Sequence, residues 1–332
     1  MHIPDAVLDP KVLAATGLVA AAGVAYGAWS LRGATRDRTP VLMGSMAAFV
    51  FAAQMVNFPV PLIPASGHLL GGVLAAVLLG PWAGALVIGA VLLVQCFLFG
   101  DGGLTALGAN FVNMGLIGAV GGYAISAPIR RLIGGPRGVL VGSMVAAWFA
   151  VILASGAFAV ELAAATGGRG FLGILKWMTL VHAAIGLGEA LITGTVVRFL
   201  LLVRPDLVDG GVWEPGFGPA PAPGPARRWA GVAVGGLMVA ASVAIFLAPL
   251  ASSRPDGLEY VGTEKLRFLP AEGEPAPEPP LAAPVPDYKM PGLAAYPPAA
   301  ATAAAGLVGT LTVFGVGLGL ARGFARGAAD AA

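Results

Sequence analysis

Residues 82–99, WAGALVIGAVLLVQCFLF, form an apolar run that contains no charged side chain. A helix of about 20 apolar residues spans the hydrocarbon core of a bilayer, because each residue adds about 1.5 Å along the helix axis. Comparable apolar runs recur along the chain, at residues 12–31, 41–57, 104–127, 138–163, 178–203, 229–250 and 299–321. We therefore predict an all-α polytopic membrane protein in the cell membrane.

The composition agrees with this class of protein. Of the 332 residues, 57% are hydrophobic and only 11% are charged, as expected of a chain whose solvent is mostly lipid. The formal net charge of +2 is small and its carriers are scattered, which argues against nucleic acid as a partner. Cys96 is the only cysteine, so neither an internal disulfide nor a thiolate metal cluster can form. The first residues lack the basic segment of a signal peptide, so we expect Met1 to be retained.

A shorter apolar segment, residues 68–80, decides the predicted topology. It would be about 20 Å long as a helix, so it either crosses the membrane or enters it and returns. If it crosses and the amino terminus lies outside, the main arginine clusters all face the cytoplasm: Arg32, Arg36 and Arg38; Arg130, Arg131 and Arg137; Arg204; Arg227 and Arg228; Arg322 and Arg326. Otherwise the clusters fall on both sides and the positive-inside bias disappears. We predict nine crossings, with the amino terminus outside and the carboxyl terminus in the cytoplasm.

Two proline-rich segments divide the chain. Residues 205–228 contain six prolines and are predicted to form a stiff cytoplasmic linker between a first unit, residues 1–204, and a second unit, residues 229–332. In the second unit, an outer loop at residues 251–298 joins the two crossings, and ten of its last 29 residues are proline. Its acidic residues, Asp256 among them, do not have the spacing of a metal site of their own.

The amino terminus, Met1-His2-Ile3-Pro4-Asp5, places the α-amine beside the imidazole of His2. Such a pair can chelate a divalent transition metal through nitrogen, and a tetragonal all-nitrogen site favours Cu(II) or Ni(II). The alternative is that a near-terminal histidine is simply solvated. The chain offers only two other imidazoles, His68 and His182, so a histidine site has few possible members.

Further motifs carry a resemblance to a known family. They are NFPVPLIPASGHLLGG at residues 57–72, LGPW at 79–82, LFGDGGLTALGAN at 98–110 and GLGEALIT at 186–193. With the amino-terminal sequence, they closely resemble the CbiM/NikM family, the substrate-capture (S) components of energy-coupling-factor transporters for cobalt and nickel. Residues 229–325, with Pro-Asp-Gly-Leu-Glu at 255–259, resemble the small companion subunit of CbiN/NikN type, fused here to the carboxyl-terminal end.

The resemblance implies that the first unit is a metal-capture domain and the second a companion domain thought to help metal enter. It also implies a near-planar site of four nitrogens: the Met1 amine, the His2 amide and imidazole, and the His68 imidazole. Planar geometry suits Ni(II) and disfavours tetrahedral Zn(II), although raw affinity would still favour Cu(II). The ligand set accepts both nickel and cobalt. The resemblance implies that cobalt, if it is the metal transported, would serve cobalamin biosynthesis.

Residues that could support the ligands are less specific. Ligating imidazoles usually donate their second N–H to an oxygen acceptor, and the candidates on the outer face are Asp5, Asn57, Ser66, Asp101 and Asn110. The alternative for these residues is turn chemistry. His182 and Glu189 lie seven residues apart on one helix face, and we favour a buried hydrogen-bonded pair over a proton-coupled element or a direct ligand role.

The chain cannot power transport alone. It contains no Gly-x-x-x-x-Gly-Lys-Ser/Thr phosphate loop, so we predict a transporter subunit and not an enzyme. The resemblance implies a transmembrane coupling (T) component and cytoplasmic ATPase subunits as partners. The alternative is a self-sufficient metal channel or ion-driven carrier, because broken segments such as residues 68–80 are common in secondary transporters.

Overall fold

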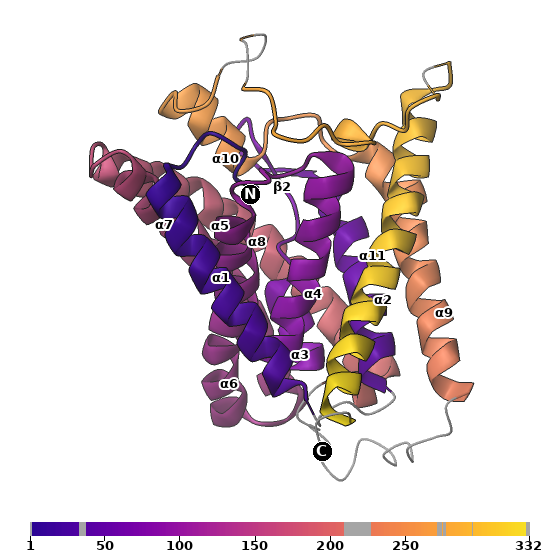
Figure 1. Ribbon diagram of the computed structural model, residues 1–332. Helices are drawn as coiled ribbons and strands as arrows, with labels where there is room; N and C mark the ends of the chain where they lie inside the picture. The colour runs from indigo at the N-terminus through magenta and orange to yellow at the C-terminus, as the bar shows by residue number, and fades with distance from the viewer. Residues whose placement is uncertain are drawn as a thin grey trace.

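The computed structural model describes residues 2–32, 38–208, 227–270, 274, 277–293 and 295–329 (Figure 1). Over these ranges, seven helices are long and apolar enough to span a membrane: Pro10–Ser30, Pro81–Phe99, Leu107–Ile133, Gly135–Ala165, Phe171–Val203, Trp229–Leu250 and Pro298–Phe324. They form a helical bundle (Figure 1). The prediction of an all-α polytopic membrane protein is confirmed.

The first unit contains α1 (Pro10–Ser30), α2 (Arg38–Gln54), α3 (Gly72–Leu79), α4 (Pro81–Val94), α5 (Leu107–Asn110), α6 (Gly122–Ile133), α7 (Gly135–Ala165) and α8 (Phe171–Val203). π-Helical stretches extend α4 over Gln95–Phe99 and join α5 to α6 over Phe111–Gly121, and a short 3-10 turn, Pro205–Leu207, follows α8. Two short strands, β1 (Phe58–Pro59) and β2 (Ser66–Gly67), pair antiparallel. Most of the predicted linker lies outside the described residues, which stop at 208 and resume at 227.

Residues 68–80 pass through the bundle without forming a full spanning helix. The β1–β2 hairpin lies at the end of the bundle where the amino terminus lies, and α3 lies toward the opposite end, beside the start of α4 (Figure 1). Only the eight residues of α3 are helical, which is about 12 Å, and a stretch without regular secondary structure precedes them. The carboxylate of Glu189 accepts hydrogen bonds from the backbone N–H groups of Leu70 (2.5 Å) and Gly71 (2.9 Å). A buried carboxylate therefore satisfies the backbone donors that lead into α3.

The second unit packs its two long helices against α2. These are α9 (Arg227–Ser242), which continues to Leu250 as π-helical and 3-10 turns, and α11 (Pro298–Ala329). Small side chains permit close contact between α2 and α9: Ala48 and Ala52 pack with Ala240 and Ala244, all fully buried. The second unit is thus attached along one side of the first, next to α2 (Figure 1).

The loop between these two helices, residues 251–298, is called the companion loop below. It includes α10 (Gly257–Tyr260), a π-helical turn at Val261–Lys265 and a 3-10 turn at Pro286–Tyr288. The loop crosses the end of the bundle that carries the amino terminus (Figure 1). Backbone hydrogen bonds hold it there, from Ser252 N to Asn57 O (2.8 Å), from Ser66 N to Pro255 O (2.7 Å) and from Val285 N to Leu98 O (2.9 Å).

Candidate metal centre

The amino-terminal segment is held against the loop that follows α4. Asn110 binds Ile3 at two points, because its Oδ1 accepts from Ile3 N at 2.8 Å and its Nδ2 donates to Ile3 O at 3.1 Å. The N–H of Gly103 donates to the same Ile3 oxygen at 2.8 Å. The carboxylate of Asp5 accepts from the N–H of Thr105 at 2.8 Å. A Cβ at Gly103 would lie 2.4 Å from Asp5 N, so only glycine permits this approach.

His2 is consequently fixed with its ring turned into the protein. Its side chain is only 7% exposed, with Nδ1 3.1 Å from Asp101 Oδ1 and Nε2 3.2 Å from Gln95 Oε1. Tyr288, from the companion loop, donates its hydroxyl to Asp101 Oδ2 at 2.6 Å. Burial lowers the pKa of His2 below its usual value, and the charge of Asp101 only partly offsets this effect. The neutral ring that results carries one nitrogen lone pair, as a metal ligand requires.

His68 lies directly after β2, and its ring stacks on that of His2. The ring centroids are 5.2 Å apart and the planes differ by 13°. Nδ1 of His68 lies 3.0 Å from the carbonyl oxygen of Leu69, which can only accept, so Nδ1 carries the hydrogen and Nε2 the lone pair. Burial, followed by nearby positive charge, lowers the pKa of His68. The structure therefore brings together two of the predicted ligands, and the third, Met1, lies outside the described residues.

Two imidazoles alone do not complete a metal site. Within the part of the chain that the structure describes, no group of three or more histidine, cysteine, aspartate or glutamate side chains is arranged to hold a metal ion. Any site at His2 and His68 therefore needs further nitrogen or oxygen atoms from outside that set of side chains.

The companion loop adds an acid that the sequence analysis did not select as a site residue. Asp256 and Glu259 form a reciprocal capping box at the start of α10, and Asp256 Oδ2 lies 4.0 Å from His68 Nε2. Burial by itself would raise the pKa of Asp256, but nearby positive charge and a hydrogen bond from Glu259 N–H lower it overall. Asp256 is therefore a fixed negative charge facing a candidate ligand. The spacing of Asp256 and Glu259 is visible in the sequence as a capping box. That spacing predicts the start of a helix, but it does not indicate that Asp256 lies near His68.

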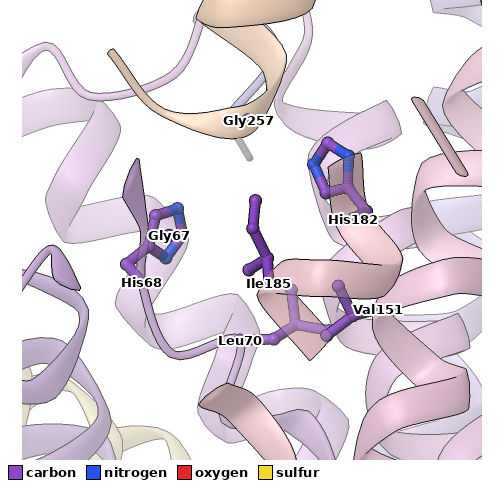
Figure 2. Close-up of a pocket in the computed structure, with 7 residues that line it drawn as sticks. All are labelled: Gly67, His68, Leu70, Val151, His182, Ile185 and Gly257. Atoms are coloured by element: carbon purple, nitrogen blue, oxygen red, sulfur yellow. The ribbon is translucent and has the colours of Figure 1, made fainter. Parts of the chain in front are cut away.

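A small cavity of about 20 Å³, room for one water molecule, lies beside His68. Figure 2 shows His68 and His182 on opposite sides of it, with Ile185 between them and Gly257 of the companion loop above. A Cβ at Gly257 would lie 2.5 Å from Ile185 Cδ1 and 3.0 Å from His182 Nε2, so a glycine is needed where the loop meets α8.

His182 and Glu189 have separate partners. Nδ1 of His182 donates to the carbonyl of Met178 at 2.8 Å, whereas Glu189 accepts from the backbone before α3. Seven residues of helix separate the two side chains by about 10 Å along the axis, which is too far for a direct hydrogen bond. The predicted hydrogen-bonded pair is therefore not what the structure shows.

The remaining candidates divide by role. Asp101 contacts the ring of His2, and Asn110 holds the backbone beside it. Ser66 instead seats the companion loop, because its hydroxyl donates to Arg254 O at 2.8 Å. The backbone carbonyl of Asn57 accepts from the same loop, and Asp5 closes the turn at residues 104–105.

Sequence reasoning also missed two buried glutamines next to His2. Gln95 Nε2 donates to Gln54 Oε1 at 2.7 Å, and Gln54 Nε2 donates to the carbonyl of Leu70 at 3.0 Å. The signal that could have found them is that polar side chains inside apolar spans usually point into the bundle and serve a function.

Comparisons with known proteins identify the families that the two units resemble. The sequence model of the family described as "Cobalt uptake substrate-specific transmembrane region" (CbiM) matches residues 2–207, and that of the PDGLE domain matches residues 230–326. A putative fused nickel transport protein NikMN of Archaeoglobus fulgidus is 36% identical over 97% of this chain and 98% of its own length. The cobalt transport protein CbiM of Sorangium cellulosum is 32% identical over 63% of this chain and 95% of its own length.

Two solved structures of transition metal transporters are also similar to this chain. The crystal structure of a truncated transition metal transporter is 31% identical, with a TM-score of 0.54, and covers 60% of this chain and 98% of that chain. A second transition metal transporter is 30% identical, with a TM-score of 0.55, over 61% of this chain and 93% of that chain. The chain therefore belongs to the CbiM family of cobalt and nickel transport proteins, with a PDGLE domain on its carboxyl-terminal side and the metal ion as its transported substrate.

Proposed function

We propose that this protein captures nickel or cobalt at the outer face of the cell membrane, as the substrate-specific component of an energy-coupling-factor transporter. The observation that carries the proposal is the stacked pair of buried imidazoles, His2 and His68, whose centroids are 5.2 Å apart. One imidazole belongs to the second residue of the chain, next to two backbone nitrogens that can also bind a metal.

The ligands of the site are the Met1 amine, the His2 amide nitrogen, His2 Nδ1 and His68 Nε2. The first three belong to consecutive residues and close two fused chelate rings, and His68 supplies the fourth position. Hydrogen bonding supports the choice on His68, where Nδ1 is engaged by Leu69 O. Binding releases protons, because the amine and amide must present lone pairs. A planar nitrogen field favours Ni(II) over tetrahedral Zn(II).

The orientation of the chain follows from the charge pattern. Arg130, Arg131 and Arg137 lie around the turn between α6 and α7, and Arg204 follows α8. This turn lies at the end of the bundle opposite the amino terminus (Figure 1). The positive-inside rule makes that end cytoplasmic, so the metal centre faces outward. Residues 1–204 form the capture domain, residues 205–228 a cytoplasmic linker, and residues 229–332 the companion domain.

Transport energy comes from partner subunits, a transmembrane coupling component and cytoplasmic ATPases, because the chain has no phosphate loop of its own. Uptake of nickel and cobalt by cells that express this chain with or without those partners tests this assignment. Uptake should require the partners and should be abolished by His68→Ala. Equal accumulation without the ATPase subunits would instead identify a self-sufficient channel or carrier.

A further inference from the structure

The two glutamines beside His2 form a continuous buried relay. Gln54, at the end of α2, and Gln95, just after α4, are 5% and 0% exposed. Burying a primary amide is costly unless its hydrogen bonds are satisfied. Both amides meet this condition through one chain of contacts that runs from the carbonyl of Leu70, through Gln54 and Gln95, to His2 Nε2.

The direction of this relay is fixed at its far end. The carbonyl of Leu70 can only accept, so Gln54 must turn its NH₂ group toward it and its oxygen toward Gln95. Gln95 then donates its NH₂ group to that oxygen, at 2.7 Å, and presents its own oxygen to His2. The N–H of the same Leu70 residue donates to Glu189, which holds this part of the backbone in place. The relay therefore requires a hydrogen on His2 Nε2.

A hydrogen on Nε2 leaves the lone pair of a neutral imidazole on Nδ1. Nδ1 is also the nitrogen that faces the carboxylate of Asp101, at 3.1 Å. A lone pair and an ionised carboxylate both attract positive charge, so the charge of Asp101 favours a metal ion at Nδ1.

We propose that Gln54 and Gln95 are positioning residues that select Nδ1 of His2 as the metal-binding nitrogen. This inference rests on the proposed function, because Nδ1 is the ring nitrogen that closes a chelate ring with the His2 amide. Histidine ligands generally depend on an acceptor for their second N–H, and here the acceptor is the side-chain oxygen of Gln95. Gln54 acts one step further away, by preventing the Gln95 amide from reversing.

The tautomer of His2 can be read directly by ¹⁵N NMR of histidine-labelled, metal-free protein in lipid bilayers. The chain has three histidines, so the His2 signals are those lost in a His2→Asn variant. The inference predicts a protonated Nε2 and an unprotonated Nδ1 in the neutral ring of the full chain. A ring protonated mainly on Nδ1 would overturn it.

Two substitutions at Gln54 test the relay without touching His2. Gln54→Leu frees the Gln95 amide to reverse, so the Nδ1-protonated tautomer should increase and nickel affinity should fall about tenfold, within the range for outer-shell partners. Gln54→Glu should preserve both, because a protonated carboxyl donates to Leu70 O with one oxygen and accepts from Gln95 with the other. Unchanged tautomer and affinity in Gln54→Leu would refute the inference.

A matched control separates positioning from general stability. Asn113→Leu removes another buried amide, which donates to Glu161 at 2.8 Å away from the relay. It should lower thermal stability but leave the His2 tautomer unchanged, and an equal tautomer shift would overturn the inference. If His2→Ala binds nickel as tightly as the unsubstituted protein does, the proposed function fails. The tautomer of His2 in metal-free protein would still test the relay in that case.

Discussion

The two imidazoles of the metal centre are held by different parts of the chain. His2 is fixed by the first unit, because Asn110 binds the adjacent Ile3 backbone and Gln95 meets the ring. Among the described residues, Tyr288 of the companion loop reaches the surroundings of His2 through its hydrogen bond to Asp101.

His68 has a different environment. Asp256 of the companion loop lies 4.0 Å from its Nε2, and Gly257 lines the cavity beside it. The comparison indicates that His2 is held mainly by residues 1–204, whereas the surroundings of His68 depend more directly on residues 251–298. Ligand geometry and access to the site can therefore be disturbed separately.

The largest expected effect comes from removing either imidazole. His2→Ala and His68→Ala should each lower nickel affinity by more than about 100-fold, beyond the range for outer-shell partners, because each leaves an incomplete ligand set. The double variant should be little worse than either single variant, since the two ligands act together. Isothermal titration of purified protein measures all three. His182→Ala is the matched control, and an equal loss in that variant would contradict the assignment.

Removing the second unit should separate binding from transport. A chain that ends near residue 206 keeps His2 and its partners, so it should still bind nickel in vitro, while cellular uptake falls sharply. Residues 226–332 supplied as a separate chain should restore uptake in part, because the linker no longer keeps the two units at high effective concentration. Full uptake by the shortened chain alone would show that the companion loop has no role in loading.

A smaller effect is expected from Asp256→Asn. Asparagine can still cap α10, but the negative charge facing His68 is lost. Stopped-flow measurements should show nickel association slowed about threefold, with less change in equilibrium affinity, because one charge contributes mainly to attracting the cation. Glu264→Gln removes a charge from the same loop and serves as a control. Equal slowing by both variants would indicate a general effect of loop charge.

The smallest effect concerns acid stability. Burial is the main cause that lowers the pKa of His68 below its usual value of 6.5, so the unfolded chain binds a proton there more readily than the folded chain. The stability that depends on neutral His68 is thus complete above pH 6.5 and is lost progressively as the pH falls below it. The melting temperature of metal-free protein should therefore fall as the pH is lowered from 7.5 to 5, and the melting temperature of His68→Gln should fall less over the same range. A steeper fall in the variant would contradict this account.

The sequence predicts most of the bundle because a spanning helix needs about 20 apolar residues, a local property. The sequence does not decide the structure of residues 68–80. The reason is that Gln54 and Glu189, which bind the backbone of Leu70 before α3, lie 16 and 119 positions away from it in the chain. His2 and His68 could be paired only through the family resemblance. Asp256 escaped notice since its neighbour His68 lies far along the chain, and a backbone contact between Ser66 and Pro255 brings the two segments together.

The central claim is that the metal is bound by nitrogens of the amino terminus together with His68. Inserting one alanine between Met1 and His2 tests it most directly, because the α-amine, amide and imidazole then no longer close adjacent chelate rings. Isothermal titration should show high-affinity nickel binding abolished, while circular dichroism and melting temperature match those of a control chain with one alanine added after Ala332. Unchanged nickel affinity in the insertion variant would contradict the four-nitrogen site.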